Sequence, residues 1–155
     1  MIKINVISSN NNWFDYIKNP NDYIGKKISK LNSRNRNFFK KKTFCTLLLS
    51  GNKEIKYLNK KFRNKNKTTD VLSFPFHTKL ELKKILRKKE EIYLGDIVIN
   101  LNKIKGKKLS KTFKIEFDYL WIHGLVHLFG YNHKKEKDFH IMKKIEKNFI
   151  NSVND

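Results

Sequence analysis

Three histidines within eleven residues are the strongest chemical signal in this chain. His123 and His127 are four residues apart in the segment HGLVHLFGYNH, so on a helix both imidazoles leave the same face, one turn apart. Gly130 allows the positive φ that ends a helix and turns the chain back, which lets His133 join them. Three imidazoles that leave one coordination position open are typical of catalytic zinc. The spacing therefore predicts that His123, His127 and His133 bind one zinc ion, or another divalent transition metal.

The residue after the first histidine distinguishes this pattern from a zinc protease. Metzincin proteases share the spacing H-E-x-x-H-x-x-G-x-x-H and use the glutamate after the first histidine as general base. Here that position is Gly124, which can neither accept nor deliver a proton. The sequence therefore argues against peptide hydrolysis, unless a base arrives from elsewhere in the fold. The remaining histidines, His77 and His140, fit no ligand spacing, and His140 is expected at the surface or as an outer hydrogen-bond partner.

The charge of the chain suggests a polyanionic partner. The formal net charge is +21 and the pI is about 10, and nucleic acid is the commonest partner of such a protein. However, only four of the 35 basic residues are arginine, Asn and Ile are abundant, and Ala and Gln are absent. Mutational bias toward AT-rich codons produces this profile, so part of the charge is attributable to composition rather than to function.

The elements that must position the histidines follow from hydrophobic periodicity. Alternating Ile2, Ile4 and Val6 predict a strand, and further strands are expected at 43–50, 70–75 and 91–100. A helix from about 112 to 129 carries the first two histidines, and a final helix is expected at about 136–149.

The other helical segments are less regular. Residues 11–32 have helical spacing that Pro20 and Gly25 interrupt, which predicts a broken or short helix. A second helix begins near Asn52. The charged segment 79–91 is compatible with either a surface helix or a long hairpin loop.

Length and composition favour one folded domain over residues 1–155. Hydrophobic residues make up 39% of the chain, with 12 Phe and 6 Tyr, which is enough for a core and excludes disorder as the default. The single cysteine, Cys45, lies in an apolar strand and is expected in the core, so no internal disulfide can form. No signal peptide and no apolar run of the roughly 18–20 residues that span a membrane is present. We expect a soluble cytoplasmic protein without a membrane partner.

The histidine segment resembles the signature of the bacterial YbeY endoribonuclease family, usually written H-G-x-L-H-L-x-G-Y-D-H. Residues 58–63 (LNKKFR) and 68–75 (TTDVLSFP) are similar to that family's L-N-x-x-x-R and T-D-V-L-S-F-P, and residues 94–99 (LGDIVI) to its L-G-D-I-x-I. Met142 stands nine residues after His133, where the family keeps a methionine. The matches run in order from about 58 to 146. One departure is Asn132, which stands where the family usually has aspartate.

The resemblance implies a metal-dependent, single-strand-specific endoribonuclease that acts in 16S rRNA 3′-end maturation and ribosome quality control. Its partners would be ribosomal RNA and the small ribosomal subunit with its assembly proteins. Arg63 matches the functional arginine of the family and would grip a phosphate bidentately. Asn132 would be an outer hydrogen-bond acceptor beside His133, with the shape of aspartate but without its charge. The side chains that could track an RNA backbone next to Arg63 are Lys60, Lys61, Lys65 and Lys67.

The resemblance also implies the fold, and two other functions stay open. The expected class is α+β, a small mixed sheet of about four strands packed with about five helices, with a metal helix like that of zinc metalloproteases. One alternative is a zinc metallopeptidase with a non-standard general base. The other is a non-catalytic ribosome assembly factor whose metal only braces the fold.

Overall fold

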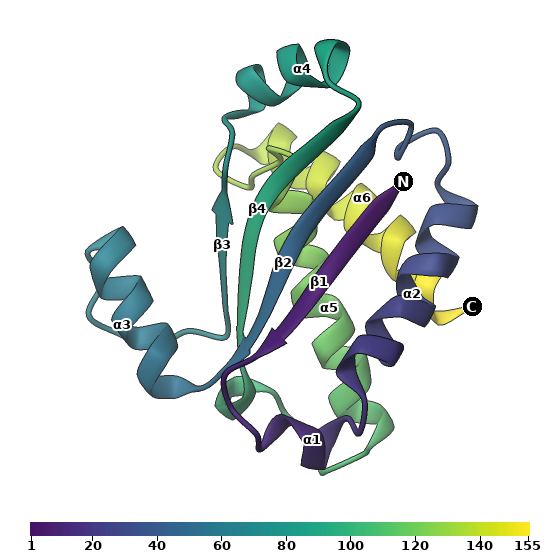
Figure 1. Cartoon of the computed structure of the whole chain (residues 1–155). Coiled ribbons are helices and arrows are strands. Elements are labelled where there is room, and N and C mark those ends of the chain that lie inside the picture. Colours follow the sequence, from purple (N-terminus) through teal and green to yellow (C-terminus); the bar gives the residue numbers. More distant parts are fainter.

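A four-stranded mixed sheet forms the centre of the protein, and the computed structural model describes all 155 residues. Its strands lie in the order β1-β2-β4-β3 (Figure 1). β1, β2 and β4 are parallel, whereas β3 runs antiparallel to β4 and forms one edge of the sheet. The bounds are Ile2–Ser8 for β1, Lys42–Ser50 for β2, Val71–Pro75 for β3 and Glu91–Asn100 for β4. The predicted α+β class and four-stranded mixed sheet are confirmed.

Six α-helices accompany the sheet, one more than the approximate number predicted. Segment 79–91, for which helix and hairpin loop were both open, is a helix followed by the start of β4. Thr78 and Glu81 form a reciprocal capping box at its start, which satisfies free backbone N–H groups there. The helices are α1 (Trp13–Tyr16), α2 (Pro20–Arg34), α3 (Asn52–Arg63), α4 (Lys79–Lys88), α5 (Lys111–Leu128) and α6 (Glu136–Asn154), with a 3-10 turn η1 at Leu101–Lys103.

The helices differ from the periodicity prediction at two places, Gly25 and the end of the last helix. The break in 11–32 does occur at Pro20, which begins α2 because its missing N–H is not needed at that position. The predicted interruption at Gly25 is wrong, since Gly25 lies inside α2 on its exposed side. α6 continues past 149 to Asn154, because Ser152 and Val153 are buried and the Ser152 hydroxyl accepts a hydrogen bond from the buried Asn35 amide.

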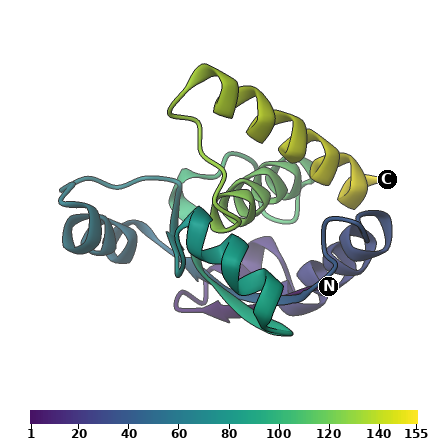
Figure 2. The same ribbon diagram turned by 90° about the horizontal axis from the view of Figure 1, so that it is seen from above.

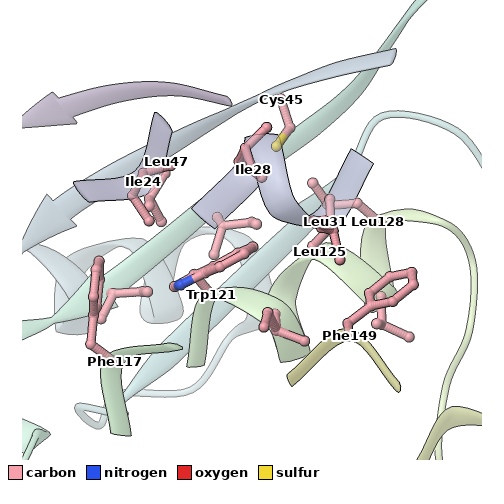
Figure 3. Close-up of a cluster of buried hydrophobic side chains, with 14 of the residues drawn as sticks. Ile24, Ile28, Leu31, Cys45, Leu47, Phe117, Trp121, Leu125, Leu128 and Phe149 are labelled. Atoms are coloured by element: carbon pink, nitrogen blue, oxygen red, sulfur yellow. The ribbon is translucent and has the colours of Figure 1, made fainter. Parts of the chain in front are cut away.

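Helices α2 and α5 cover one face of the sheet, and α6 packs outside them against both (Figures 1 and 2). The core between these layers brings Leu47 of β2 together with Ile24 of α2 and Trp121 of α5 (Figure 3). Cys45 is fully buried in this cluster, as predicted. α3 packs on the opposite face, where Ile55 contacts Leu72 and Val98. No helix of the structure is both long enough and apolar enough to cross a membrane.

The central helix α5 is buried over most of its second half, which fixes the frame of the histidine segment. Trp121, Ile122, Leu125 and Val126 are all fully buried. Gly130 follows the helix with a φ of +89°, the positive value predicted for the turn. Because α5 is held on several sides, its two histidines project from a rigid element.

Candidate metal centre

The three predicted histidines meet at the carboxyl end of α5. His123 and His127 project from the helix one turn apart, and the turn at Gly130 brings His133 back toward them. One ring nitrogen from each histidine lies within 4.8 Å of the others. The ring centroids are 4.5 Å apart for His123 and His127, and 5.3 Å apart for His127 and His133. The sequence spacing therefore corresponds to a convergent group in space that could hold a metal ion.

The outer nitrogens of two rings are hydrogen-bonded in a way that suits a metal ligand. His123 Nδ1 lies 2.5 Å from Glu146 Oε1, and His127 Nδ1 lies 2.9 Å from the backbone oxygen of Tyr131. Both oxygens are acceptors, so both Nδ1 atoms donate and both Nε2 atoms carry free lone pairs. These two Nε2 atoms face each other at 3.0 Å. Two lone pairs at that distance repel each other unless a cation lies beside them, so the donor set fits a divalent metal.

The charges around the rings favour the ligating state. Burial, followed by repulsion from His123 whenever that ring is protonated, lowers the pKa of His127 to about 4, so its imidazole is neutral at physiological pH. Neutral imidazole is the form that binds metals. Burial acts to raise the pKa of Glu146, but the hydrogen bond from His123 and the nearby Lys143 outweigh it and lower that pKa. Glu146 is therefore a buried carboxylate that can stabilise positive charge on the histidine site.

Gly124 lies against the sheet, and its packing explains the absence of a protease-type base. A Cβ at this position would lie 2.6 Å from Ile97 Cγ2 and 3.2 Å from Ser73 Oγ. Real Cβ atoms essentially never approach another atom as closely as 2.6 Å. Position 124 therefore faces strands β3 and β4 rather than the open side of the histidines, and a glutamate there would have no space.

Arg63 is the last residue of α3, and two contacts orient it. Its Nη2 donates to the backbone oxygen of Ser73 at 2.8 Å, and its guanidinium carbon lies 5.8 Å from the centre of the Phe74 ring. Asn64 follows in the left-handed conformation, with φ +55°, and ends the helix. Since Ser73 uses one of five guanidinium N–H donors, the others are available to a ligand.

The loop after Arg63 is fixed by two buried asparagines. Asn59 donates from its side chain to the backbone oxygen of Lys67, and its own backbone oxygen accepts from Lys65. Asn100 of β4 donates to the Thr68 hydroxyl and to the backbone oxygen of Thr69. These bonds attach the loop to the sheet, which explains why the LN and TT residues accompany Arg63 in the sequence pattern.

A single cleft joins Arg63 to the histidines. It has a volume of about 890 Å³ and is lined by all three histidines together with Arg63 and residues of β3 and α4. Two carboxylates, Asp70 and Glu81, also line it, so basic groups are in excess. The basic side chains in its lining are Arg63, Lys65, Lys79 and Lys134.

The predicted lysines divide into two groups. Lys65 lines the cleft beside Arg63. Lys60, Lys61 and Lys67 are exposed but do not line it, and the Lys61 ammonium lies over the rings of Tyr57 and Phe62 instead. Lys79 and Lys134 line the cleft although the sequence pattern gave no reason to select them.

Asn132 and the two remaining histidines are placed as follows. Asn132 lines the cleft, but its side-chain oxygen accepts from the backbone N–H of Lys134 at 3.2 Å. The outer partners of the rings are Glu146 and Tyr131, so the role predicted for Asn132 stays a prediction. His77 lines the cleft, and His140 is 71% exposed on α6.

Glu146 is the residue that the sequence reasoning missed. It lies on α6, 23 residues after His123, so no local spacing connects the two. One signal was available: Glu146 occupies the same helical face as Met142 and Phe149, which are apolar and buried. A carboxylate on such a face needs a buried partner.

Comparison with known proteins identifies relatives along nearly the whole chain. A family model described as Endoribonuclease YbeY matches residues 9–154. A Pelagibacter ubique protein named Endoribonuclease YbeY is 46% identical over 149 residues, which cover 94% of this chain and 92% of that protein. One from Ehrlichia canis with the same name is 33% identical, covering 94% of this chain and 88% of that protein.

A solved structure also matches. The solution structure of TM1509 from Thermotoga maritima has a TM-score of 0.60 at 23% identity, and the match covers 99% of this chain and 89% of that one. At this identity the likeness concerns the fold.

Proposed function

The chain belongs to the YbeY family of endoribonucleases, hydrolases that act on RNA, and on that premise we propose that it cleaves single-stranded RNA with the help of a bound metal. We further propose that its substrate is the 3′ end of 16S ribosomal RNA and that it acts in ribosome quality control. The observation that carries the proposal is the one cleft that contains Arg63 together with His123, His127 and His133.

In this proposal the histidines hold one zinc ion or another divalent transition metal. When bound, such an ion polarises a phosphoryl oxygen and makes water more acidic. Glu146 and the backbone oxygen of Tyr131 orient two of the rings so that their Nε2 atoms face each other and would be free to hold the ion. Arg63 binds the scissile phosphate through the N–H groups that Ser73 leaves free, and stabilises the charge that develops on it.

Features of the cleft support a single-stranded substrate. Phe76, His77 and Tyr131 line it and offer ring faces to unpaired bases. Lys65 can bind the backbone beside Arg63, and the more distant Lys60, Lys61 and Lys67 extend the positive surface along α3 and the following loop. The net charge of +21 favours association with RNA by the same electrostatic effect.

The cellular setting is part of the proposal. We propose that residues 1–155 act as one domain in the cytoplasm, together with the small ribosomal subunit and its assembly proteins. Asn132, next to His133, would then change the metal affinity of the site, because it is neutral at a position where the family usually has a charged residue.

The test combines metal analysis with RNA cleavage. Purified protein should contain about one equivalent of metal by mass spectrometry and should cut a single-stranded 16S 3′-end precursor, but not the same sequence in a duplex. His123→Ala should lose both the metal and the cleavage. Cleavage that survives in His123→Ala would point to a contaminating nuclease and overturn the proposal. Mapping the product ends shows whether the RNA 2′-hydroxyl attacks, since that route leaves a 2′,3′-cyclic phosphate.

The two alternative functions predict other results. A metallopeptidase would turn over peptides in a chelator-sensitive way without cutting RNA, and the packing of Gly124 on Ile97 counts against a base at the usual position. A non-catalytic assembly factor would support normal ribosome maturation as a folded, metal-free variant.

A further inference from the structure

A second cavity, of about 600 Å³, adjoins the cleft on the far side of α4's first turn. Its lining residues come from α4, the loop that joins α2 to β2, the start of β2, and the segment that follows α5. Lys79 and Tyr131 line both this cavity and the cleft, so the two spaces meet at that pair. Its volume is within the range of roughly 300–1,000 Å³ that is usual for small-ligand sites.

The lining of this second cavity combines rings with positive charge. Half of its twelve residues are hydrophobic, and none is Asp or Glu. Four lysines contribute to it, including Lys83 of α4 and Lys40 of the α2–β2 loop. A cavity that is apolar inside, basic at its rim and free of carboxylates suits a ligand with a flat ring and a negative charge. A nucleotide has both.

The aromatic side of the cavity is held rigid by ring packing. Phe38 is at its centre, with ring centroids 5.0 Å from Phe39, 5.1 Å from Phe129 and 5.0 Å from Phe149. The Tyr131 ring is 6.5 Å from Phe38 and tilted toward it. Phe38 and Tyr131 are half-buried, so a base can stack on their accessible parts, on Tyr131 in place of the Lys79 ammonium that lies 4.9 Å from the ring centre.

Thr43, at the buried end of the cavity, points independently to a polar ligand. It lines the cavity, is only 4% exposed, and its hydroxyl is the one buried side-chain polar atom without a hydrogen-bond partner in the protein. Such atoms are rare and costly in folded proteins. The hydroxyl has almost no accessible surface, so a base edge in the cavity bonds to it only after the Thr43 side chain rotates toward the cavity.

Lys79 and Tyr131 form the boundary between the second cavity and the cleft. The Lys79 ammonium lies 4.9 Å from the centre of the Tyr131 ring, and Gly130 packs so closely that a Cβ there would lie 2.8 Å from Lys79 Cβ. An RNA strand that leaves the histidine cleft between Lys79 and Tyr131 would enter the second cavity with Lys79 beside its sugar–phosphate backbone. A phosphate at the boundary would be attracted to this lysine.

We propose that this second cavity is a nucleotide subsite of the cleft, which holds one unpaired base of the single-stranded RNA and a neighbouring phosphate. The base stacks on the accessible parts of Phe38 and Tyr131, and rotation of the Thr43 side chain brings its hydroxyl to the edge of the base, while Lys79 and Lys83 bind phosphate. The subsite rests on the proposed function, because it needs the RNA to occupy the cleft. Such a subsite would make binding depend on an unpaired nucleotide at a fixed distance from the cleavage position.

The test measures RNA binding in the presence of EDTA, so that no cleavage occurs. Single-stranded RNAs of about ten nucleotides, a usual site size, are made with one abasic position moved along the chain. Loss of the base at one position should weaken binding by roughly tenfold, as removal of a stacked base does, and neighbouring positions should matter less. Equal effects at every position would overturn the subsite.

Two variants connect that position with the cavity. Thr43→Val keeps the shape of the side chain and removes its hydroxyl, so the protein should stay folded, and the penalty for the abasic position should become smaller. Lys83→Glu should weaken binding more than Lys84→Glu, which makes the same charge change on the next residue of α4 outside both cavities. An abasic penalty unchanged in Thr43→Val, or equal effects of the two lysine variants, contradicts the proposal.

Cleavage of the same RNA by the wild type with added zinc distinguishes failure of the proposed subsite from failure of the proposed endoribonuclease function. If the wild type cuts RNA but shows no position-specific base effect, the subsite is wrong and the endoribonuclease proposal stands. If no RNA is cut under any metal, the proposed function itself fails.

Discussion

The carboxylate of Glu146 on α6 lies 2.5 Å from Nδ1 of His123 on α5. The side chain of Glu146 is 10% exposed and that of His123 is 31% exposed, so water weakens this contact little. The bond fixes the ring rotation and directs Nε2 toward the other histidines. α6 therefore contributes to the candidate metal centre although it carries none of the three histidines.

Replacing Glu146 should weaken metal binding without removing a ligand. We expect Glu146→Ala to lower zinc affinity by about 10–100-fold, the usual effect of losing an outer partner of a ligating histidine. Glu146→Gln should have a smaller effect, because its amide oxygen can still accept from Nδ1. Competition with a zinc-binding dye measures both. Glu136→Ala is the control. Glu136 lies on the same helix, its side chain is 93% exposed, and its histidine neighbour is the exposed His140, 4.0 Å away, rather than one of the three clustered histidines. Equal affinities in Glu136→Ala and Glu146→Ala would contradict the role.

The close approach of Gly124 to Ile97 predicts that a single added methyl group destabilises α5, the helix that carries His123 and His127. Gly124→Ala should lower the free energy of unfolding by about 1–2 kcal/mol, since overpacking exceeds the gain in helix propensity. Gly25→Ala, the same change inside α2 with no atom within 4 Å, should raise it by about 0.5–1 kcal/mol. Urea denaturation measures both values.

A double variant tests whether Ile97 is the cause. Ile97→Ala removes the atom that the new Cβ would meet, so Gly124→Ala should cost less in that background. If the cost of Gly124→Ala is the same with and without Ile97, the close approach is not what requires glycine.

Arg63 should act on the phosphate and not on the metal. Arg63→Ala should reduce kcat/KM for RNA by about 10²–10³-fold, the effect of removing one group that stabilises transition-state charge, while the zinc content stays unchanged. Arg63→Lys should recover little, because an ammonium cannot bind a phosphate bidentately. Lys56→Ala, an exposed change on the same helix outside the cleft, is the control. A loss of zinc in Arg63→Ala would assign Arg63 a structural role instead.

Local sequence patterns were enough to predict most of the fold and the three candidate metal ligands. The histidines are close in sequence, and a helix with a glycine turn is enough to bring them together. The strands at 43–50 and 91–100 were predictable because each is rich in apolar residues over a short length and is flanked by charged or turn-forming residues. Gly25 misled the prediction, since a glycine on the exposed side of a helix costs only about 1 kcal/mol and long helices tolerate it.

Long-range packing decided what the sequence could not show. Glu146 and Lys79 approach the histidine site only after α6 and α4 have docked, and neither has a local spacing to the ligands. The composition of the chain also gave no way to select the lysines that line the cleft. Lysine is so frequent that Lys65 in the cleft and Lys60 outside it could be told apart only by their place in the fold.

Cys45 provides a pH-dependent test of the core. Burial, followed by the charge of Asp96, raises the pKa of its thiol to about 12. In the unfolded chain the thiol ionises near pH 8.5. Between these values the folded state holds a proton that the unfolded state has lost. This contribution to stability is complete below about pH 8.5 and is lost as the pH rises toward 12.

The free energy of unfolding of the wild type should therefore fall above pH 8.5 by up to about 1.4 kcal/mol per pH unit relative to Cys45→Ala. Subtracting the variant removes the contribution of lysines and tyrosines, which titrate in both proteins. Urea denaturation from pH 7.5 to 10 measures the difference, and the native thiol should react with a thiol reagent only after denaturant is added, because Cys45 is fully buried. Parallel pH profiles for the two proteins, or rapid labelling of the native thiol, would show that the sheet and α2 do not exclude water from Cys45.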